Sequence, residues 1–310
     1  MIVKNEEKII TRMLDSVITF IDTFCIVDTG STDNTVQVIM DYFKGKNIAG
    51  KLGNIPFQNF EKTRNWAMEM SLGMSDYTLF MDADMILVHN ISKENLTKDY
   101  YAFFQQSGDV RFHNTRIVKN NGSFYYRGVT HEVILSREKV EGEILPDHLV
   151  KIIDKGDGGC KYNKLSRDKK MLEDHIDDKE MTSRYHFYLA NTLLALGNID
   201  KSIELYEKRL KMGGWKQELW CTCYKLGCIF YLVKDFHKSM FYFLEAYNYD
   251  KNRVENLYYL FKFYKDINKK SISDIYLNIA LDIIKNKDYR SGDLFLEAKF
   301  YNPNLFTSFS

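Results

Sequence analysis

Two aspartates separated by one small residue, Asp82-Ala83-Asp84, follow a strand-like stretch that runs from Tyr77 to Met81. Side chains at positions i and i+2 of an extended segment point to the same face, so this spacing predicts two converging carboxylates. Hard divalent cations such as Mg²⁺ and Mn²⁺ prefer oxygen ligands, and Mg²⁺ sites often combine one or two carboxylates with substrate phosphates. The alternative is an exposed turn that happens to contain two aspartates.

A second group of polar residues follows the strand predicted at 23–27. Asp28 begins a turn that contains Gly30 and leads into a helix expected over residues 35–43. Strand–turn–helix units of this kind present a loop and a helix start to nucleotides. The alternative for Asp28 is ordinary turn chemistry.

Arg64 and Asn65 lie near the start of a helix expected over residues 59–70. An arginine at this place can bind a diphosphate with bidentate geometry. The alternative is a surface salt bridge, and the residues by themselves favour neither interpretation.

Antiparallel strands are predicted within residues 109–127, with a hairpin turn at 120–122, and they lead to His131 and Glu132. His131 is a candidate metal ligand and Glu132 a candidate general base. Both are also compatible with polar positions on a strand. On an ideal strand the two side chains would point to opposite faces, so only a turn would bring both to one site.

A later strand, predicted at 149–153, ends at Asp154 and a glycine-rich loop that contains Asp157. Either carboxylate is a candidate metal ligand. The alternative is a turn by which the chain leaves the domain.

The first 84 residues alternate between strand and helix, which predicts a mostly parallel sheet. Further elements are expected as strands at 1–3 and 55–57 and as a helix at 7–20. From Ser166 onward the apolar residues recur with a helical period. The fold class predicted is α/β plus all-α, with a sheet domain at 1–160 and a helical domain at 161–310.

The helical half contains an internal repeat. Ser202 aligns with Ser239 and Tyr206 with Phe243, an offset of 37 residues. This is close to the ~34-residue helix–turn–helix repeat of tetratricopeptide proteins. A third, weaker unit is expected between residues 255 and 283. The helices would form either a concave surface for an acceptor or dimer partner, or a buttress for the sheet domain.

Composition limits the classes of partner. The 43 basic and 42 acidic residues of the 310-residue chain give a formal charge of +1, which gives no indication of a nucleic-acid partner. Apolar runs are shorter than a membrane span, and the start lacks a signal-peptide pattern. Five scattered cysteines without a disulfide framework favour a reducing, cytoplasmic location.

Four motifs in order resemble the inverting family 2 glycosyltransferases, which have the GT-A fold and use nucleotide-diphosphate sugars. They are Ile2-Val-Lys-Asn-Glu-Glu7, Val27-Asp-Thr-Gly-Ser-Thr-Asp-Asn-Thr35, Thr63-Arg-Asn65 and Met81-Asp-Ala-Asp84. The second half resembles the tetratricopeptide extension of a subset of that family, through segments such as Arg184-Tyr-His-Phe-Tyr-Leu-Ala190 and Gly213-Gly-Trp215.

The resemblance implies roles for individual residues. Glu132 would be the catalytic base, because it lies roughly where related enzymes carry an acidic base. Glu6 and Asp28 would contact the nucleoside, and Asp84 would bind the metal. The full set expected to bind the nucleotide sugar is Val3, Asn5, Glu6, Asp28, Arg64, Asn65, Asp82 and Ala83, and the expected metal ligands are Asp82, Asp84, Asp154 and His131.

The function expected is therefore a Mn²⁺- or Mg²⁺-dependent, inverting hexosyl transfer from a nucleotide-diphosphate sugar, UDP-linked, to a sugar or protein acceptor. The acceptor would dock on the helical domain, and a homodimer is compatible with that surface. One alternative is a nucleotidyltransferase of related fold, although a Gly-rich phosphate loop with Lys or Arg does not follow the first strand. The other is a catalytically idle scaffold whose helical repeats bind partners.

Overall fold

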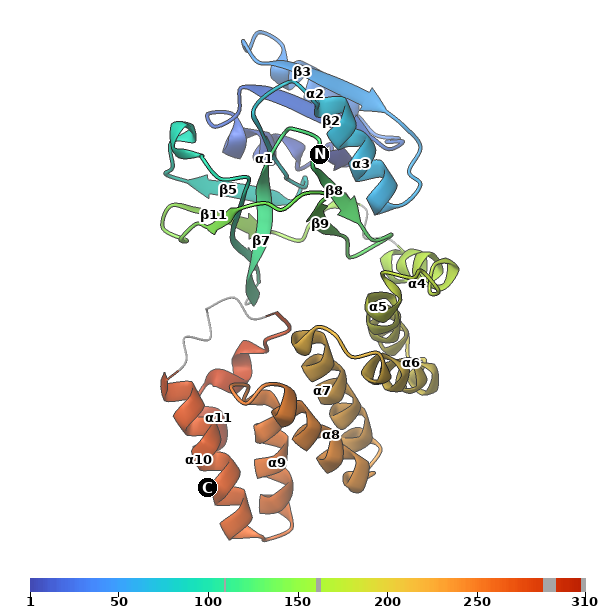
Figure 1. The fold of residues 1–310 in the computed structure, drawn as a ribbon, viewed down its shortest axis with the longest axis vertical. Coiled ribbons are helices and arrows are strands. Elements are labelled where there is room, and N and C mark those ends of the chain that lie inside the picture. Colours follow the sequence, from blue (N-terminus) through green and yellow to red (C-terminus); the bar gives the residue numbers. More distant parts are fainter. Residues whose placement is uncertain (109, 160–162, 287–293, 308–310) are drawn as a thin grey trace. The chain divides into compact units, whose positions relative to one another are not determined.

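A computed structural model describes residues 1–108, 110–159, 163–286 and 294–307. The chain divides into two compact units, Met1–Arg167 and Asp168–Ser310. The first combines strands with helices and the second is helical (Figure 1). The predicted class, α/β followed by all-α, is confirmed. The predicted boundary at residue 160 stays a prediction.

Three strands at the start of the first unit form a parallel sheet in the order β1-β2-β3. The strands are β1 (Ile2–Val3), β2 (Thr23–Asp28) and β3 (Ala49–Asn54), and the helices between and after them are α1 (Ile10–Val17), α2 (Thr35–Phe43) and α3 (Phe60–Ser71). The register places Val3 beside Asp28. The ends of β1 and β2 therefore bring the residues after each of them to the same edge.

The prediction of a mostly parallel sheet was wrong beyond these three strands. Among the described residues, a second sheet has the order β4-β7-β6-β11-β5, with β10 paired to β6. Its strands are β4 (Tyr77–Leu79), β5 (Met85–His89), β6 (Tyr100–Ser107), β7 (Val110–Lys119), β10 (Gly142–Ile144) and β11 (Val150–Asp154). The pairs β4–β7, β6–β7 and β5–β11 are antiparallel. The longest pairing in this sheet is the antiparallel hairpin of β6 and β7. The alternation of strand and helix in the first 84 residues carries no information about this later hairpin.

Two local predictions were also wrong. Residues 55–57 are not a strand. The strand of this region, β3, lies in the preceding glycine-containing stretch. Gly50 in β3 lies against the ring of Phe24, so a side chain there would collide with it. The segment 120–122 does connect β7 to β8 (Phe124–Arg127), but β8 pairs with β9 (Val133–Ser136) rather than with β7.

Apolar side chains from both sheets and from α1 and α2 form the core of the first unit. They include Val3, Ile10, Leu14, Ile26, Ile39, Met85, Phe103 and Ile152. The register of the second sheet places Asp154 opposite Met85 across the β5–β11 pair. Because Asp84 directly precedes Met85, this pairing brings the end of β11 next to Asp84.

The second unit consists of helical hairpins. Its helices are α5 (Thr182–Ala195), α6 (Ile199–Lys211), α7 (Lys216–Leu232), α8 (Phe236–Tyr249), α9 (Glu255–Asp266), α10 (Lys270–Asn286) and α11 (Asn304–Thr307), preceded by α4 (Lys164–Asp174), which spans the division between the units. Short 3₁₀ helices are η1 (Lys93–Asn95) in the first unit and η3 (Ala298–Tyr301) in the second.

A repeated hydrogen bond joins the helices of each hairpin. Ser202, Ser239 and Ser273 are buried, and each hydroxyl donates to a carbonyl 12 residues earlier, on Ala190, Gly227 and Phe261 respectively. The bond explains why serine is tolerated where the repeat usually has alanine, since the buried hydroxyl has a partner. It also identifies the third hairpin that the sequence predicted only weakly.

Gly227 provides a test of this packing. A Cβ at position 227 would lie 2.6 Å from the buried ring of Phe243. Alanine would gain up to about 1 kcal/mol of helix propensity, but overpacking costs typically ~1–3 kcal/mol. We expect Gly227→Ala to lower the free energy of unfolding, measured by urea denaturation, and Lys201→Ala at an exposed site of α6 to leave it nearly unchanged. A more stable Gly227→Ala variant would show that the hairpin relaxes freely.

Candidate active site at the strand ends

Asp82 and Asp84 have different surroundings. Strand β4 ends at Leu79, and the chain then turns, with the Met85 amide donating to the Asp82 carbonyl at 3.1 Å. Asp82 is paired with two arginines, whereas Asp84 Oδ2 accepts a bond from the Gly158 amide at 3.3 Å. The extended geometry expected from the sequence does not persist to Asp84, and the two carboxylates have different partners.

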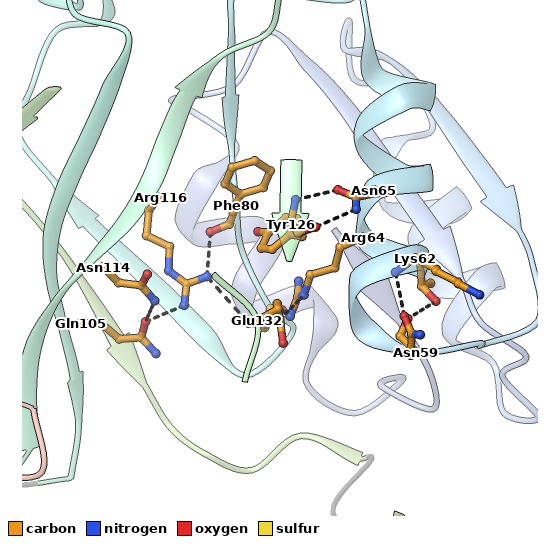
Figure 2. Close-up of polar contacts among 12 residues, drawn as sticks. Asn59, Lys62, Arg64, Asn65, Phe80, Gln105, Asn114, Arg116, Tyr126 and Glu132 are labelled. Atoms are coloured by element: carbon orange, nitrogen blue, oxygen red, sulfur yellow. Dashed lines mark hydrogen bonds and ion pairs between the residues drawn. The ribbon is translucent and has the colours of Figure 1, made fainter. Parts of the chain in front are cut away.

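Arg64 connects two of the predicted functional carboxylates. Its Nη2 lies 2.8 Å from Asp82 Oδ1 and its Nε lies 2.6 Å from Glu132 Oε1. Figure 2 shows the guanidinium extending from α3 toward Glu132, beside Tyr126. Asn59 begins this helix by accepting the Lys62 amide, which fixes the turn that carries Arg64. The arginine is therefore part of a largely buried ion-pair network rather than a surface salt bridge.

This network determines the charge of Asp82. Burial by itself would raise the pKa of Asp82, but the nearby guanidinium groups of Arg64 and Arg116 outweigh burial and hold the pKa below its usual value. Asp82 is thus ionised and its charge is compensated by protein cations.

Glu132 and His131 lie in the connection between β8 and β9 rather than on a strand. His131 has a positive φ of 52°, which breaks the alternation expected for two adjacent strand residues. The start of α3 holds this connection, because the Gly128 amide donates to Glu61 and the Phe60 amide donates to the Val129 carbonyl. Glu132 faces Arg64, and no cluster containing His131 could hold a metal among the described residues.

Asn65 anchors the neighbouring strand. Its Nδ2 donates to the Tyr126 carbonyl and its Oδ1 accepts the Tyr126 amide, at 2.8 and 2.7 Å. These two bonds, visible in Figure 2, use both ends of the carboxamide to hold α3 against β8. The predicted contact of Asn65 with a nucleotide sugar stays a prediction.

The residues after β1 and β2 bind each other. Asp28 is buried and accepts the amides of Gly30 and Ser31, so turn chemistry does occupy its carboxylate. Asn5 has a φ of 56° and its Oδ1 accepts the Thr32 amide. Val3 is buried beside Asp28. If Val3, Asn5 or Asp28 contacts a nucleoside, the contact would therefore be made by two loops, after β1 and after β2, that already bind each other.

Glu6, Asp84 and Asp154 form an acidic group closed by the loop after β11. Glu6 Oε2 accepts the Gly159 amide at 2.9 Å, and Asp84 accepts that of Gly158. A side chain at Gly159 would place its Cβ 2.1 Å from the Asn5 carbonyl oxygen, which explains the glycine. Burial, together with Asp154 and Asp82, raises the pKa of Asp84.

Arg12, Gln105 and Arg116 also take part, and sequence reasoning missed them. Arg12 binds Asp157 through two bonds of 2.9 and 2.7 Å, so Asp157 holds the loop to α1. Gln105 contacts both Arg116 and Asp154. Arg12 follows the first motif by five residues, whereas Gln105 and Arg116 lie far in sequence from all four motifs. Only the pattern of polar residues on otherwise apolar strands could have indicated Gln105 and Arg116.

A cavity of about 700 Å³ adjoins the Arg64 network, because Arg64 and Tyr126 are among the residues that line it. Most of its lining is apolar and comes from α1, β2 and β4, with Val17, Phe24 and Leu79 as examples. The lining includes neither Glu132 nor the acidic group of Glu6, Asp84 and Asp154, so this cavity is not the candidate active site.

Residues 1–131 match the family model described as Glycosyl transferase family 2. The first unit carries a family 2 glycosyltransferase domain. The match covers somewhat less than half of the chain and does not extend into the helical unit. No curated protein matches the chain.

Among solved structures, S. aureus TarS 1-349 is 13% identical, with 80% of this chain and 89% of that chain covered and a TM-score of 0.42. The same protein in complex with UDP has the same identity and coverage and a TM-score of 0.35. MamA 41-end from Desulfovibrio magneticus RS-1 is 13% identical over 40% of this chain and 71% of that chain, with a TM-score of 0.34. Scores this low do not establish a common fold.

The family 2 domain has carboxylates that fit a divalent cation only in part. Among the described residues, no three His, Cys, Asp or Glu side chains are grouped so that they could hold a metal ion. The predicted set of Asp82, Asp84, Asp154 and His131 is therefore not assembled as a cage. Asp84 and Asp154 nevertheless remain close enough to repel each other. One or two carboxylates are enough when substrate phosphates complete a Mg²⁺ site.

Glu6 is expected to make the folding stability of the family 2 domain depend on pH. Burial, reinforced by the charges of Asp84, Asp33 and Asp82, raises the pKa of Glu6 to about 7 despite the bond from Gly159. A raised folded-state pKa favours folding below the unfolded value of 4.5, and this contribution is lost as pH rises toward 7.

We therefore expect Glu6→Gln to flatten the fall in stability between pH 4.5 and 7, by up to ~1.4 kcal/mol per pH unit. The measurement is urea denaturation of both proteins across this range. Glu94→Gln, at an exposed site, is the control. Parallel pH curves for the wild type and Glu6→Gln would contradict the raised pKa.

Proposed function

We propose that this chain transfers a hexosyl group from a nucleotide-diphosphate sugar, UDP-linked, to an acceptor hydroxyl with inversion and with the help of Mn²⁺ or Mg²⁺. The observation that carries the proposal is the acidic group of Asp84, Asp154 and Glu6 within a family 2 domain. Asp82 is neutralised by arginines, whereas burial, together with the charges of Asp154 and Asp82, raises the pKa of Asp84. A divalent cation would balance that excess negative charge and could bind a diphosphate at the same time.

Asp84 and Asp154 would hold the cation in this proposal, and its chemistry would be to neutralise the departing diphosphate. The remaining work falls to the protein. The acceptor oxygen forms a bond to the anomeric carbon while the bond from that carbon to the diphosphate oxygen breaks on the opposite face. Arg64 binds one oxygen of Glu132, Oε1, so the other can accept the acceptor's proton. The nucleoside diphosphate leaves with the bonding electrons.

Arg64 would position the base in this scheme. Because the same guanidinium binds Asp82 and Glu132, it places the proposed base at a fixed distance from the Asp82-Ala83-Asp84 turn. Contacts of Val3, Asn5, Glu6, Asp28, Asn65 and Ala83 with the donor belong to the same proposal.

Thermal unfolding with UDP, GDP and their sugar conjugates, each with Mn²⁺, Mg²⁺ or EDTA, tests the donor. A ligand that binds the folded state raises the midpoint according to its concentration and affinity. We expect a metal-dependent shift with UDP and a larger one with a single UDP-sugar. Release of UDP in the presence of an acceptor would support transfer, whereas release of pyrophosphate from a nucleoside triphosphate would favour a nucleotidyltransferase. Unchanged midpoints with every nucleotide would favour a helical scaffold.

The described helices include none that is both long enough and apolar enough to cross a membrane. A cytoplasmic location, an acceptor on the helical unit and a homodimer all stay predictions.

A further inference from the structure

Gln105 connects Asp154 of the acidic group to Arg116. It lies on β6 with 5% of its surface exposed, and its carboxamide has three polar neighbours. Oε1 accepts Arg116 Nη2 at 2.5 Å and Asn114 Nδ2 at 3.2 Å, while Nε2 donates to Asp154 Oδ2 at 3.0 Å. Figure 2 shows Arg116, Asn114 and Gln105 converging from neighbouring strands.

The chemistry of these neighbours fixes the orientation of the amide. A guanidinium has only donors and an ionised carboxylate has only acceptors. Turning the amide over would place its NH₂ group against Arg116 and its oxygen against Asp154, with repulsion at both ends. Gln105 therefore presents a donor to Asp154 in every favourable arrangement.

Arg116 ties this amide to Asp82. The side chain is 7% exposed, with Nη1 3.4 Å from the Phe80 carbonyl and 3.8 Å from Asp82 Oδ2. Among the described residues its Nε has no hydrogen-bond partner, so Arg116 is held through its two terminal nitrogens. Asp82, Arg116, Gln105 and Asp154 form one continuous chain of polar contacts.

We infer that Gln105 is a positioning residue for Asp154 and that Arg116 orients Gln105. The inference rests on the proposed function, in which Asp84 and Asp154 hold a divalent cation. Asp154 Oδ1 accepts the Gly156 amide and Oδ2 accepts Gln105, so the carboxylate plane is set from two directions. Residues that orient metal ligands typically contribute ~10–100-fold to metal affinity.

The test measures how much Mn²⁺ tightens UDP binding, as the ratio of the UDP Kd in EDTA to that in Mn²⁺. We expect Gln105→Met to lower this ratio ~10–100-fold while UDP binding in EDTA stays the same. Asn114→Ala removes a bond to the same amide but leaves Arg116 in place, and it is the matched control, expected to keep the ratio. An unchanged ratio in Gln105→Met would overturn the inference.

A second measurement separates positioning from a general structural role. If Gln105 acts through Asp154, Gln105→Met should cause no further loss in an Asp154→Ala background. Additive losses in the double variant would overturn the inference. Should Gln105→Met fail to fold by circular dichroism, Gln105→Glu keeps the shape and the Arg116 contact but turns an acceptor toward Asp154, and a wild-type ratio in that variant would also overturn it.

The same data separate a failure of the inference about Gln105 from a failure of the proposed metal-dependent function. A wild-type protein whose UDP affinity is identical in Mn²⁺ and EDTA would refute the metal proposal and the inference together. A metal-dependent wild type with an equally metal-dependent Gln105→Met variant would refute only the role of Gln105.

Discussion

Replacing Asp84 with asparagine is expected to reduce metal-dependent sugar transfer by ~10²–10³-fold, the typical cost of losing one stabiliser of transition-state charge, here the cation that Asp84 would hold. Asp84 is the carboxylate of the Asp82-Ala83-Asp84 turn that forms no ion pair with an arginine among the described residues, and burial together with Asp154 and Asp82 raises its pKa. Asparagine keeps the shape and the bond from Gly158, so the fold should survive. The loss should therefore appear in turnover and not in stability.

The measurement is UDP release from the donor identified by thermal unfolding, at several Mn²⁺ concentrations. Asp22→Asn is the control, because the Asp22 side chain is 71% exposed and, among the described residues, its ion pair is with Lys93. Removing one of several repelling carboxylates is expected to leave Asp84→Asn at least as stable as the wild type. Full turnover in Asp84→Asn would refute the role of Asp84 in holding the cation.

Replacing Arg64 with methionine should have the largest effect on stability, a loss of ~3–5 kcal/mol. The Arg64 side chain is 12% exposed and pairs with Asp82 and Glu132, so its removal leaves two partly buried carboxylates without their shared cation. Arg116, 3.8 Å from Asp82, compensates only one of them and at longer range. Lys93→Met, which breaks an exposed pair, should cost at most ~1 kcal/mol.

The pH dependence of the stability loss in Arg64→Met tests whether the uncompensated carboxylates cause it. The lowered pKa of Asp82 stabilises the folded state above the unfolded value of 3.8, and this contribution is lost as pH falls through the folded-state pKa. The difference in unfolding free energy between wild type and Arg64→Met should therefore narrow in acid. Adding Glu132→Gln to Arg64→Met should restore part of the stability at neutral pH, because one uncompensated charge disappears. A double variant less stable than Arg64→Met would contradict this account.

Much of the candidate site could be located from sequence because its carboxylates follow strands. Asp28 ends β2, Asp154 ends β11, and Asp82 and Asp84 lie between β4 and β5. Strand ends are signalled locally by an apolar run that stops at a polar residue. The serine repeat of the helical unit was also visible, because Ser202 and Ser239 recur at a helical-hairpin spacing.

The sheet arrangement was not visible, because pairing between strands is a long-range property. Strand β6 is apolar on both faces along part of its length and gave no alternation to recognise. Its pairing with β7 and β11 makes the second sheet mixed and carries Gln105 toward Asp154. Sequence spacing cannot supply such contacts, which join residues dozens of positions apart.

The sequence by itself determined the class of the chain and the identity of most acidic side chains at the strand ends. Only the tertiary structure decided which charge each carboxylate meets. Only one residue separates Asp82 from Asp84. Arginines from α3 and β7 neutralise Asp82, whereas Asp84 has acidic neighbours. The reason is that electrostatic surroundings depend on distances in space, and these are set by how α3, β7 and β11 pack around the turn.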